Sequence, residues 1–180
     1  MNVHSDPAAR PDRKPVAVLV GAPGSGKSTI GPMLAAALGV VFRDVDEDIV
    51  VTAGKPISEI FVDDGEEHFR ALERAAVANA LSTHDGVLSL GGGAILAAAT
   101  RELLRSHTVV YLSVELPDAI SRVGLGSGRP LLAMNPRATL KFLLDQRRPL
   151  YEEVAALTVK TDGRTPEEIT QELARALAPS

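Results

Sequence analysis

The residues with the clearest chemistry form one run near the N-terminus, Gly21-Ala22-Pro23-Gly24-Ser25-Gly26-Lys27-Ser28. This run matches the pattern G-x-x-x-x-G-K-[ST] in full. Glycines let the backbone turn tightly and present its N–H groups to phosphate oxygens. Lys27 can reach the β- and γ-phosphates, and the Ser28 hydroxyl can bind Mg²⁺. The pattern therefore predicts a binding site for a nucleoside triphosphate.

A second candidate site is acidic and reads Asp44-Val45-Asp46. We expect it to follow the second strand in an extended conformation, in which residues 44 and 46 point the same way. Two carboxylates beside a triphosphate suit two tasks: one contacts Mg²⁺ through water, and the other holds an acceptor hydroxyl or takes its proton. The alternative is an acidic helix start, which fits the neighbouring Glu47 and Asp48.

Short apolar stretches alternate with helical stretches along the chain and would position these residues. The predicted strands are Pro15–Val20, Val40–Phe42, Val87–Leu90, 108–114 and 157–160. The predicted helices are Thr29–Leu38, 47–53, one opened by Pro56, Glu66–Leu81, 97–105, 117–123, 136–147, one about Pro149–Ala155, and 166–177. Such alternation predicts an α/β fold, a single three-layer domain with a central, mostly parallel five-stranded sheet flanked by helices.

Composition narrows the class of protein. The chain has 180 residues, 19 Lys and Arg against 23 Asp and Glu, and no Cys. The net charge of −4 argues against bulk binding of nucleic acid or of an anionic membrane, and the lack of Cys excludes a thiolate metal site. No apolar stretch resembles a signal peptide or a membrane span, so we expect a cytoplasmic protein. Residues 1–14 are predicted to be a disordered leader, and 15–178 to be the domain.

Three further segments carry candidate binding residues. In Phe69-Arg70-Ala71-Leu72-Glu73 the spacing of three puts Arg70 and Glu73 on one helix face, although taken alone this fits an ordinary surface ion pair. Gly91-Gly92-Gly93 follows a predicted strand and allows close approach of a ligand. Alternating glycines lead to Arg129, which fits a mobile flap, a lid at about 123–135, that delivers positive charge to a phosphoryl group.

Taken together, these motifs resemble the shikimate kinases, small P-loop phosphotransferases. The resemblance covers 15–178 and also includes Arg129-Pro130-Leu131-Leu132 and Arg147-Arg148-Pro149-Leu150-Tyr151. It implies the use of ATP with Mg²⁺ to phosphorylate the 3-hydroxyl of shikimate, giving shikimate 3-phosphate, a step of aromatic amino-acid biosynthesis. It also implies a protein that we expect to be monomeric and to have no nucleic-acid or membrane partner.

The resemblance assigns roles by position. For shikimate it implies Asp46, Arg70, Gly91, Gly92, Gly93 and Arg147, with Glu73 as the structural carboxylate beside them. For ATP it implies Gly24, Ser25, Gly26, Lys27, Ser28, Thr29, Arg122, Arg129 and Arg164, and for the metal Ser28 and, through water, Asp44. Asp46, Lys27 and Arg129 are the implied catalytic residues, and Ser89 the implied water-holding hydroxyl.

Some alternatives remain open at this point. Arg147-Arg148 offers two arginines for the shikimate carboxylate, and we choose Arg147 by its distance from Pro149. Lys160 stands where the family commonly has Asp, which bears on the adenine contacts. Other functions with the same loop are a gluconate-type or nucleotide kinase of this fold, or a decayed ATP-binding module.

Overall fold

The computed structural model describes residues 14–123 and 135–179. It contains a five-stranded sheet in the order β2-β3-β1-β4-β5, and each neighbouring pair is parallel. The strands are β1 (Ala17–Val20), β2 (Phe42–Asp44), β3 (Val87–Ser89), β4 (Val109–Ser113) and β5 (Leu157–Lys160). The α/β class and the sheet predicted from the sequence are confirmed, and the sheet is wholly parallel.

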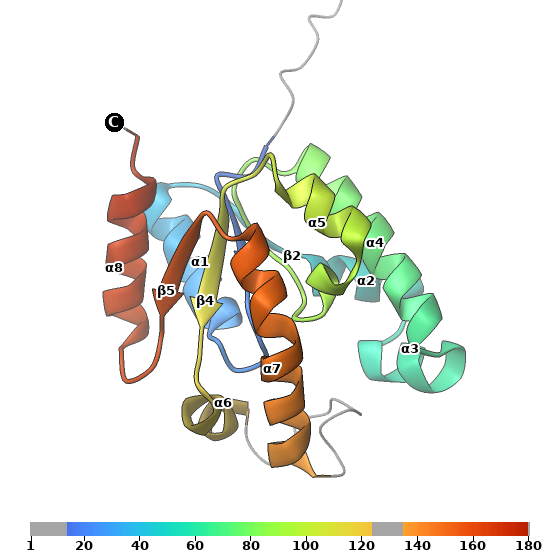
Figure 1. Cartoon of the computed structure of the whole chain (residues 1–180). Coiled ribbons are helices and arrows are strands. Elements are labelled where there is room, and N and C mark those ends of the chain that lie inside the picture. The colour runs from blue at the N-terminus through green and yellow to red at the C-terminus, as the bar shows by residue number, and fades with distance from the viewer. Residues whose placement is uncertain (1–13, 124–134, 180) are drawn as a thin grey trace, which may run out of the picture.

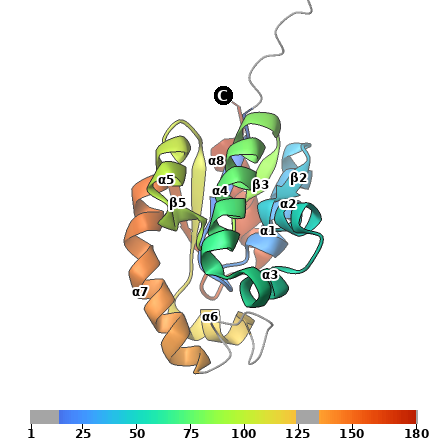
Figure 2. The ribbon, with the colours of Figure 1, turned by 90° about the vertical axis from the view of Figure 1, so that its right-hand side faces the viewer.

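Helices cover both faces of this sheet (Figures 1 and 2). The helices are α1 (Lys27–Leu38), α2 (Val45–Ala53), α3 (Ile57–Asp64), α4 (Glu66–Thr83), the 3₁₀ helix η1 (Ala94–Leu96), α5 (Ala98–Leu104), α6 (Leu116–Val123), α7 (Pro136–Val154) and α8 (Pro166–Leu177). Along β1, Ala17 and Leu19 pack with α1 and α8, whereas Val18 and Val20 pack with the helices of the other face, among them α4 and α7. Burial on both faces explains why β1 is a continuous apolar run.

Parallel pairing brings the carboxyl ends of all five strands to one edge of the sheet. The glycine-rich loop follows β1, the acidic segment follows β2, and the triple glycine follows β3. The strand order places β1 between β3 and β4, where the connections turn to opposite sides, and ligands of such sheets bind at this point. The backbone topology alone therefore brings the three candidate segments to one edge of the sheet.

Two helix predictions were wrong in detail. The chain forms one helix, α7, across Pro149, where the sequence predicted two. Pro149 lies on the exposed side, and the buried stripe continues past it through Leu143, Arg147, Tyr151 and Val154. Packing of that stripe offsets the hydrogen bond that proline removes.

The acidic segment also differs from its prediction. The second strand is Phe42–Asp44 rather than Val40–Phe42, and Asp46 already lies in the first turn of α2. Asp44 remains extended and caps this helix, because its carboxylate accepts a hydrogen bond of 2.9 Å from the Asp46 N–H. The expectation that Asp44 and Asp46 lie in one extended segment is therefore wrong.

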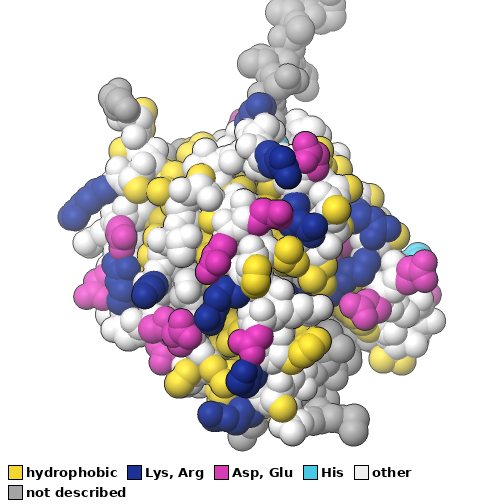
Figure 3. Space-filling model, viewed as in Figure 1, with side chains coloured by type: hydrophobic (Ala, Val, Ile, Leu, Met, Phe, Trp, Pro, Cys, Tyr) yellow, Lys and Arg dark blue, Asp and Glu magenta, His cyan; other side chains and the backbone are white. Residues whose placement is uncertain are grey.

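The surface agrees with the modest net charge. On the face seen in Figure 3, basic and acidic side chains are interspersed. Among the described residues, no helix is long and apolar enough to cross a bilayer. The predicted leader, apart from Lys14, and the predicted lid with Arg129 lie outside the described residues, except for the lid's ends at Val123 and Asn135.

Candidate active site

The glycine-rich loop is shaped by its own backbone. Gly24 and Gly26 have φ angles of 80° and 99°, which side chains other than glycine rarely adopt. The Ser25 N–H donates to the Ala22 carbonyl, and α1 begins at Lys27, directly after the loop. The positive end of α1 and the N–H groups of its first turn therefore face the loop, an arrangement that binds phosphate.

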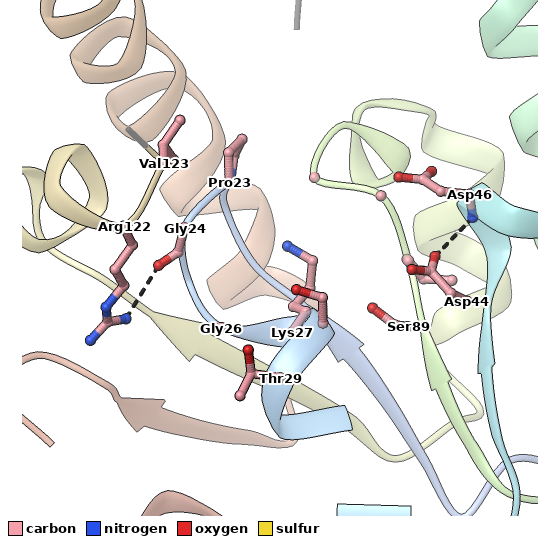
Figure 4. Close-up of a pocket in the computed structure, with 14 residues that line it drawn as sticks. Pro23, Gly24, Gly26, Lys27, Thr29, Asp44, Asp46, Ser89, Arg122 and Val123 are labelled. Atoms are coloured by element: carbon pink, nitrogen blue, oxygen red, sulfur yellow. Dashed lines mark hydrogen bonds between the residues drawn. The ribbon is translucent and has the colours of Figure 1, made fainter. Parts of the chain in front are cut away.

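This loop forms one wall of a cavity of about 460 Å³ (Figure 4). Residues from the carboxyl ends of β1, β2 and β3 and from α6 line it: Pro23, Gly24, Gly26, Lys27, Ser28, Thr29, Asp44, Asp46, Ser89, Leu90, Gly91, Gly92, Arg122 and Val123. The Lys27 ammonium lies between Arg122 on one side and the two aspartates on the other, and it donates to the carbonyls of Gly21 (2.6 Å) and Ala22 (3.2 Å). The cavity thus has a cationic side and an acidic side.

Arg122 joins three elements at the cationic side. Its guanidinium donates to the Gly24 carbonyl at 3.2 Å, and to the hydroxyl and the carbonyl of Thr161 at 2.8 Å each. It thereby ties α6 to the phosphate loop and to the segment after β5. Thr161 is fully buried and also donates to the Ser113 carbonyl, a role that no pattern in the sequence indicates.

Arg164 occupies a different place from Arg122. Its guanidinium donates to the Lys160 carbonyl and pairs with Glu172 of α8 at 2.6 Å. It lines a surface groove along α8 and is not among the residues that line the cavity. Its predicted contact with adenine stays a prediction.

The acidic side concentrates negative charge. Burial raises the pKa of Asp44 to about 6, the hydrogen bond from Asp46 N–H and the charge of Lys27 lower it, and the carboxylates of Asp46 and Glu47 raise it. Asp44 and Ser28 offer side-chain oxygen atoms, the kind of ligand that Mg²⁺ prefers. Within residues 14–123 and 135–179, no group of three or more His, Asp or Glu side chains can hold a metal by itself.

Arg70 and Glu73 are not a surface ion pair. They lie 2.8 Å apart on α4, and their side chains are only 18% and 4% exposed. Burial raises the pKa of Glu73, as does the charge of Asp46, and Arg70 and Arg147 oppose the shift. The structure therefore excludes the ordinary surface ion pair that the spacing alone allowed.

The triple glycine lets this charged group close around the backbone. A Cβ on Gly91 would lie 2.7 Å from Asp46 Oδ1 and 3.1 Å from Glu73 Oε2, and one on Gly93 would collide with the Arg70 guanidinium. A Cβ on Gly92 would stand 3.3 Å from Pro23 Cδ and 3.4 Å from Arg147 Nη1. Glycine is needed here because side chains from both sides reach the main chain.

Arg147 and Arg148 lie in opposite environments. Arg147 is 5% exposed, and its Nε has no hydrogen-bond partner among the described residues. Burial lowers its pKa, and so does the nearby charge of Arg70. Arg148 instead pairs with Glu115 at the surface, at 3.3 Å. Of the two arginines, the structure brings Arg147 to the triple glycine.

Tyr151 is a site residue to which the sequence assigned no role. Its hydroxyl donates to the Gly92 carbonyl, and its ring stacks on that of Tyr111 with centroids 4.9 Å apart. The available signal was its spacing, since Tyr151 lies one helical turn after Arg147 on the same face.

Comparison with known proteins agrees with this geometry. A sequence model described as "Shikimate kinase" matches residues 23–178. A shikimate kinase of Salinispora tropica is 70% identical over 166 residues, which cover 92% of this chain and 99% of the relative. One of Streptomyces coelicolor is 58% identical over 157 residues, or 87% and 92% of the two chains.

A solved structure agrees as well. The shikimate kinase from Acinetobacter baumannii, determined in complex with shikimate, superposes with a TM-score of 0.87 at 36% identity. The match covers 92% of this chain and 93% of that one. The likeness therefore extends over almost the whole domain rather than over the phosphate loop alone.

Proposed function

Because the chain belongs to the shikimate kinase family, we propose that its cavity transfers the γ-phosphoryl group of ATP to the 3-hydroxyl of shikimate. The observation that carries this proposal is the convergence of Asp46, Arg70 and Arg147 on the triple glycine beside the phosphate loop. A plain ATP-binding site needs none of these three residues. The product, shikimate 3-phosphate, belongs to the synthesis of aromatic amino acids.

The nucleotide binds along the loop and the start of α1. Backbone N–H groups hold phosphate oxygens, and Lys27 turns from the loop carbonyls to the β- and γ-phosphates. Arg122 lines the cavity on the side proposed for adenine. The Ser28 hydroxyl and, through water, Asp44 would hold Mg²⁺, whose chemistry when bound is to neutralise charge on the phosphate oxygens.

Shikimate binds next to the acidic side of the cavity, at the triple glycine, where Arg70 and Arg147 approach Gly93 and Gly92. Its carboxylate pairs with the guanidinium groups of Arg70 and Arg147, since arginine forms forked hydrogen bonds with carboxylates. A carboxylate here would compensate the buried and incompletely paired Arg147. Glu73 holds the Arg70 guanidinium in place through their hydrogen bond.

The transfer is an in-line displacement. The 3-hydroxyl oxygen bonds to the γ-phosphorus while the bond from that phosphorus to the β,γ-bridging oxygen breaks, and ADP leaves with the electron pair. Asp46 orients the hydroxyl and accepts its proton. Lys27 stabilises the charge on the transferring group, a task proposed also for Arg129, which lies outside the described residues.

An assay of the purified protein tests this function. ADP release is measured with shikimate, gluconate and nucleoside monophosphates, each with ATP and Mg²⁺, and the proposal expects turnover with shikimate alone. Turnover with gluconate or a nucleotide instead would assign another kinase of this fold. Tight ATP binding without any phosphorylated acceptor would indicate a binding module.

Two broader proposals accompany this function. We infer a monomeric enzyme, and light scattering at assay concentration tests this. We also infer a cytoplasmic location, which fractionation of cells tests directly.

A further inference from the structure

Arg101 of α5 connects the triple-glycine segment to α7 without belonging to the cavity. Its Nη1 donates to the carbonyls of Ile95 (2.8 Å) and Leu96 (3.0 Å), at the end of the 3₁₀ helix η1. Its Nε pairs with Glu153 of α7 at 2.8 Å. We propose that Arg101 is a positioning residue that sets the shape of the acceptor pocket, an inference that rests on the proposed function.

The first step is the bonding of the glycine segment itself. The Gly91 carbonyl accepts from the Ala94 N–H, and the Gly93 carbonyl accepts from the Leu96 N–H, both at 3.1 Å. The Gly92 carbonyl accepts from the Tyr151 hydroxyl. All three glycine carbonyls are therefore held from within the protein, two of them by η1.

These bonds also orient the N–H groups. In a planar trans peptide, the carbonyl of one residue and the N–H of the next point in opposite directions. Fixing the carbonyls of Gly91 and Gly92 thus fixes the N–H groups of Gly92 and Gly93 on the other side. Gly92 lines the cavity, so the position of η1 decides how the backbone meets the acceptor.

Arg101 caps the C-terminal end of η1. The last carbonyls of a short 3₁₀ helix have no partners inside the helix, and an arginine can serve two of them with one nitrogen while its other nitrogens bond elsewhere. Arg101 is 22% exposed, whereas its partner Glu153 is 50% exposed, so the arginine is the more enclosed of the two.

The pair with Glu153 links this clamp to the helix that carries Arg147. Helix α7 is linked to this region twice: Tyr151 donates to the Gly92 carbonyl, and Glu153 pairs with Arg101, which bonds the end of η1. Arg147 lies on the same helix one turn before Tyr151, next to Gly92. Arg101 therefore fixes the position of the glycine-segment backbone relative to Arg147. It is not among the residues that line the nucleotide side.

Steady-state kinetics of Arg101→Gln test the proposal. Removing the charged fork is expected to raise the KM for shikimate about tenfold, while the KM for ATP stays within about twofold. Arg105→Gln is the matched control, because Arg105 lies just after α5 and pairs only with Glu102 at the exposed surface among the contacts of the described residues. It should leave both constants unchanged.

Two further variants keep the test decisive if Arg101→Gln does not fold. Glu153→Ala should raise the KM for shikimate about threefold, and Arg101→Lys should fall between wild type and Arg101→Gln because one ammonium cannot replace the fork. In the double variant Arg101→Gln/Glu153→Ala the rise should match that of Arg101→Gln alone.

Other results would overturn the proposal. A merely structural role would lower the Tm and the active fraction without changing either KM, or would raise both KM values together. A shikimate KM that stays within about twofold of wild type in Glu153→Ala and Arg101→Lys would contradict it as well. Failure of the proposed function is distinguishable, because the wild-type protein would then not turn over shikimate.

Discussion

The two sides of the cavity are built in different ways. The nucleotide side comes mainly from one continuous stretch, residues 21–29, to which α6 adds Arg122, and its shape depends on backbone conformation at Gly24 and Gly26. The acceptor side comes from side chains of α2, α4 and α7 that meet at the glycine segment after β3. The geometry of the phosphate loop is set by its own backbone, whereas the geometry of the acceptor side depends on how elements distant in the sequence pack together.

The difference extends to electrostatics. On the acceptor side, Glu73 and Arg147 are almost fully buried, and the pKa of each is shifted by burial and by its charged neighbours. Buried charges that share partners respond together when one is removed. Substitutions there should affect acceptor use strongly and leave nucleotide binding intact, and the following variants test that separation.

The largest effect is expected for Asp46→Asn. An amide cannot accept the hydroxyl proton, so kcat should fall about 10³-fold, while the Kd for ATP stays near wild type. Stopped-flow turnover and equilibrium ATP binding measure the two quantities. Asp48→Asn is the control, since Asp48 pairs with Arg43 at 2.8 Å and does not line the cavity. A rise in the Kd for ATP as large as the fall in kcat would show that the two sides of the cavity do not act separately.

A stability effect is expected where the two sides meet, at Asp44. Its pKa is about 6 in the folded chain, against an ordinary value of 3.8 for an aspartate carboxyl. Between these pH values the folded chain binds a proton that the unfolded chain does not, so wild-type stability falls as pH rises to 6, and the loss persists above it.

Asp44→Asn removes this penalty and keeps a good helix cap. Without nucleotide or Mg²⁺ at pH ~7.5, its free energy of unfolding should exceed that of wild type by about 1–2 kcal/mol, less than the full shift implies because Asp44 is only partly buried and solvent screens its charge. The gain should shrink toward pH ~4. Urea unfolding at both pH values measures this. A variant less stable than wild type at the higher pH would show that burial of this carboxylate costs nothing.

Arg147→Lys should raise the KM for shikimate roughly 20-fold, because an ammonium cannot reproduce the forked contact with a carboxylate. Arg148→Lys, at the surface beside Glu115, is its neighbour control and should behave as wild type. Initial rates at varied shikimate decide between them. If the larger rise belongs to Arg148→Lys, the carboxylate contact moves to that residue.

The smallest effect is expected on the nucleotide side. Arg122→Gln loses the bonds to Gly24 and Thr161, and the KM for ATP should rise about fivefold without a change in that for shikimate. Arg164→Gln should change the KM for ATP less, because Arg164 pairs with Glu172 outside the cavity. The reverse order would favour Arg164 over Arg122 as the adenine contact.

Much of the fold was predictable because it depends on local patterns. Two such signals are the apolar strand before the phosphate loop and the glycine that ends α1. That glycine, Gly39, adopts a φ of 68° in the structure, as expected of a helix C-cap. The two helices predicted around Pro149 failed because proline is a local signal, and the buried stripe of α7 overrides it through packing.

The candidate site divides in the same way. Lys27 and Ser28 were identified from spacing alone, whereas Arg70 and Glu73 alone suggested a surface pair, and only tertiary packing buries them. Tyr151 and Thr161 donate to carbonyl groups far away in the sequence, those of Gly92 and Ser113, and Arg101 donates to the carbonyls at the end of η1. The helical spacing places Tyr151 on the same face as Arg147, but no spacing in the sequence indicates which carbonyl each of these residues bonds. The capping of α2 by Asp44 was missed because the strand ends later than its apolar residues suggest.

The most direct test of the central claim is analysis of the product by ³¹P and ¹H NMR. Purified protein is incubated with ATP, Mg²⁺ and shikimate, and ADP is measured alongside. The account predicts that every ADP formed is matched by one shikimate phosphorylated at the 3-hydroxyl. ADP formed without phosphorylated shikimate, or phosphate on another hydroxyl, would contradict the proposed arrangement of Asp46, Arg70 and Arg147.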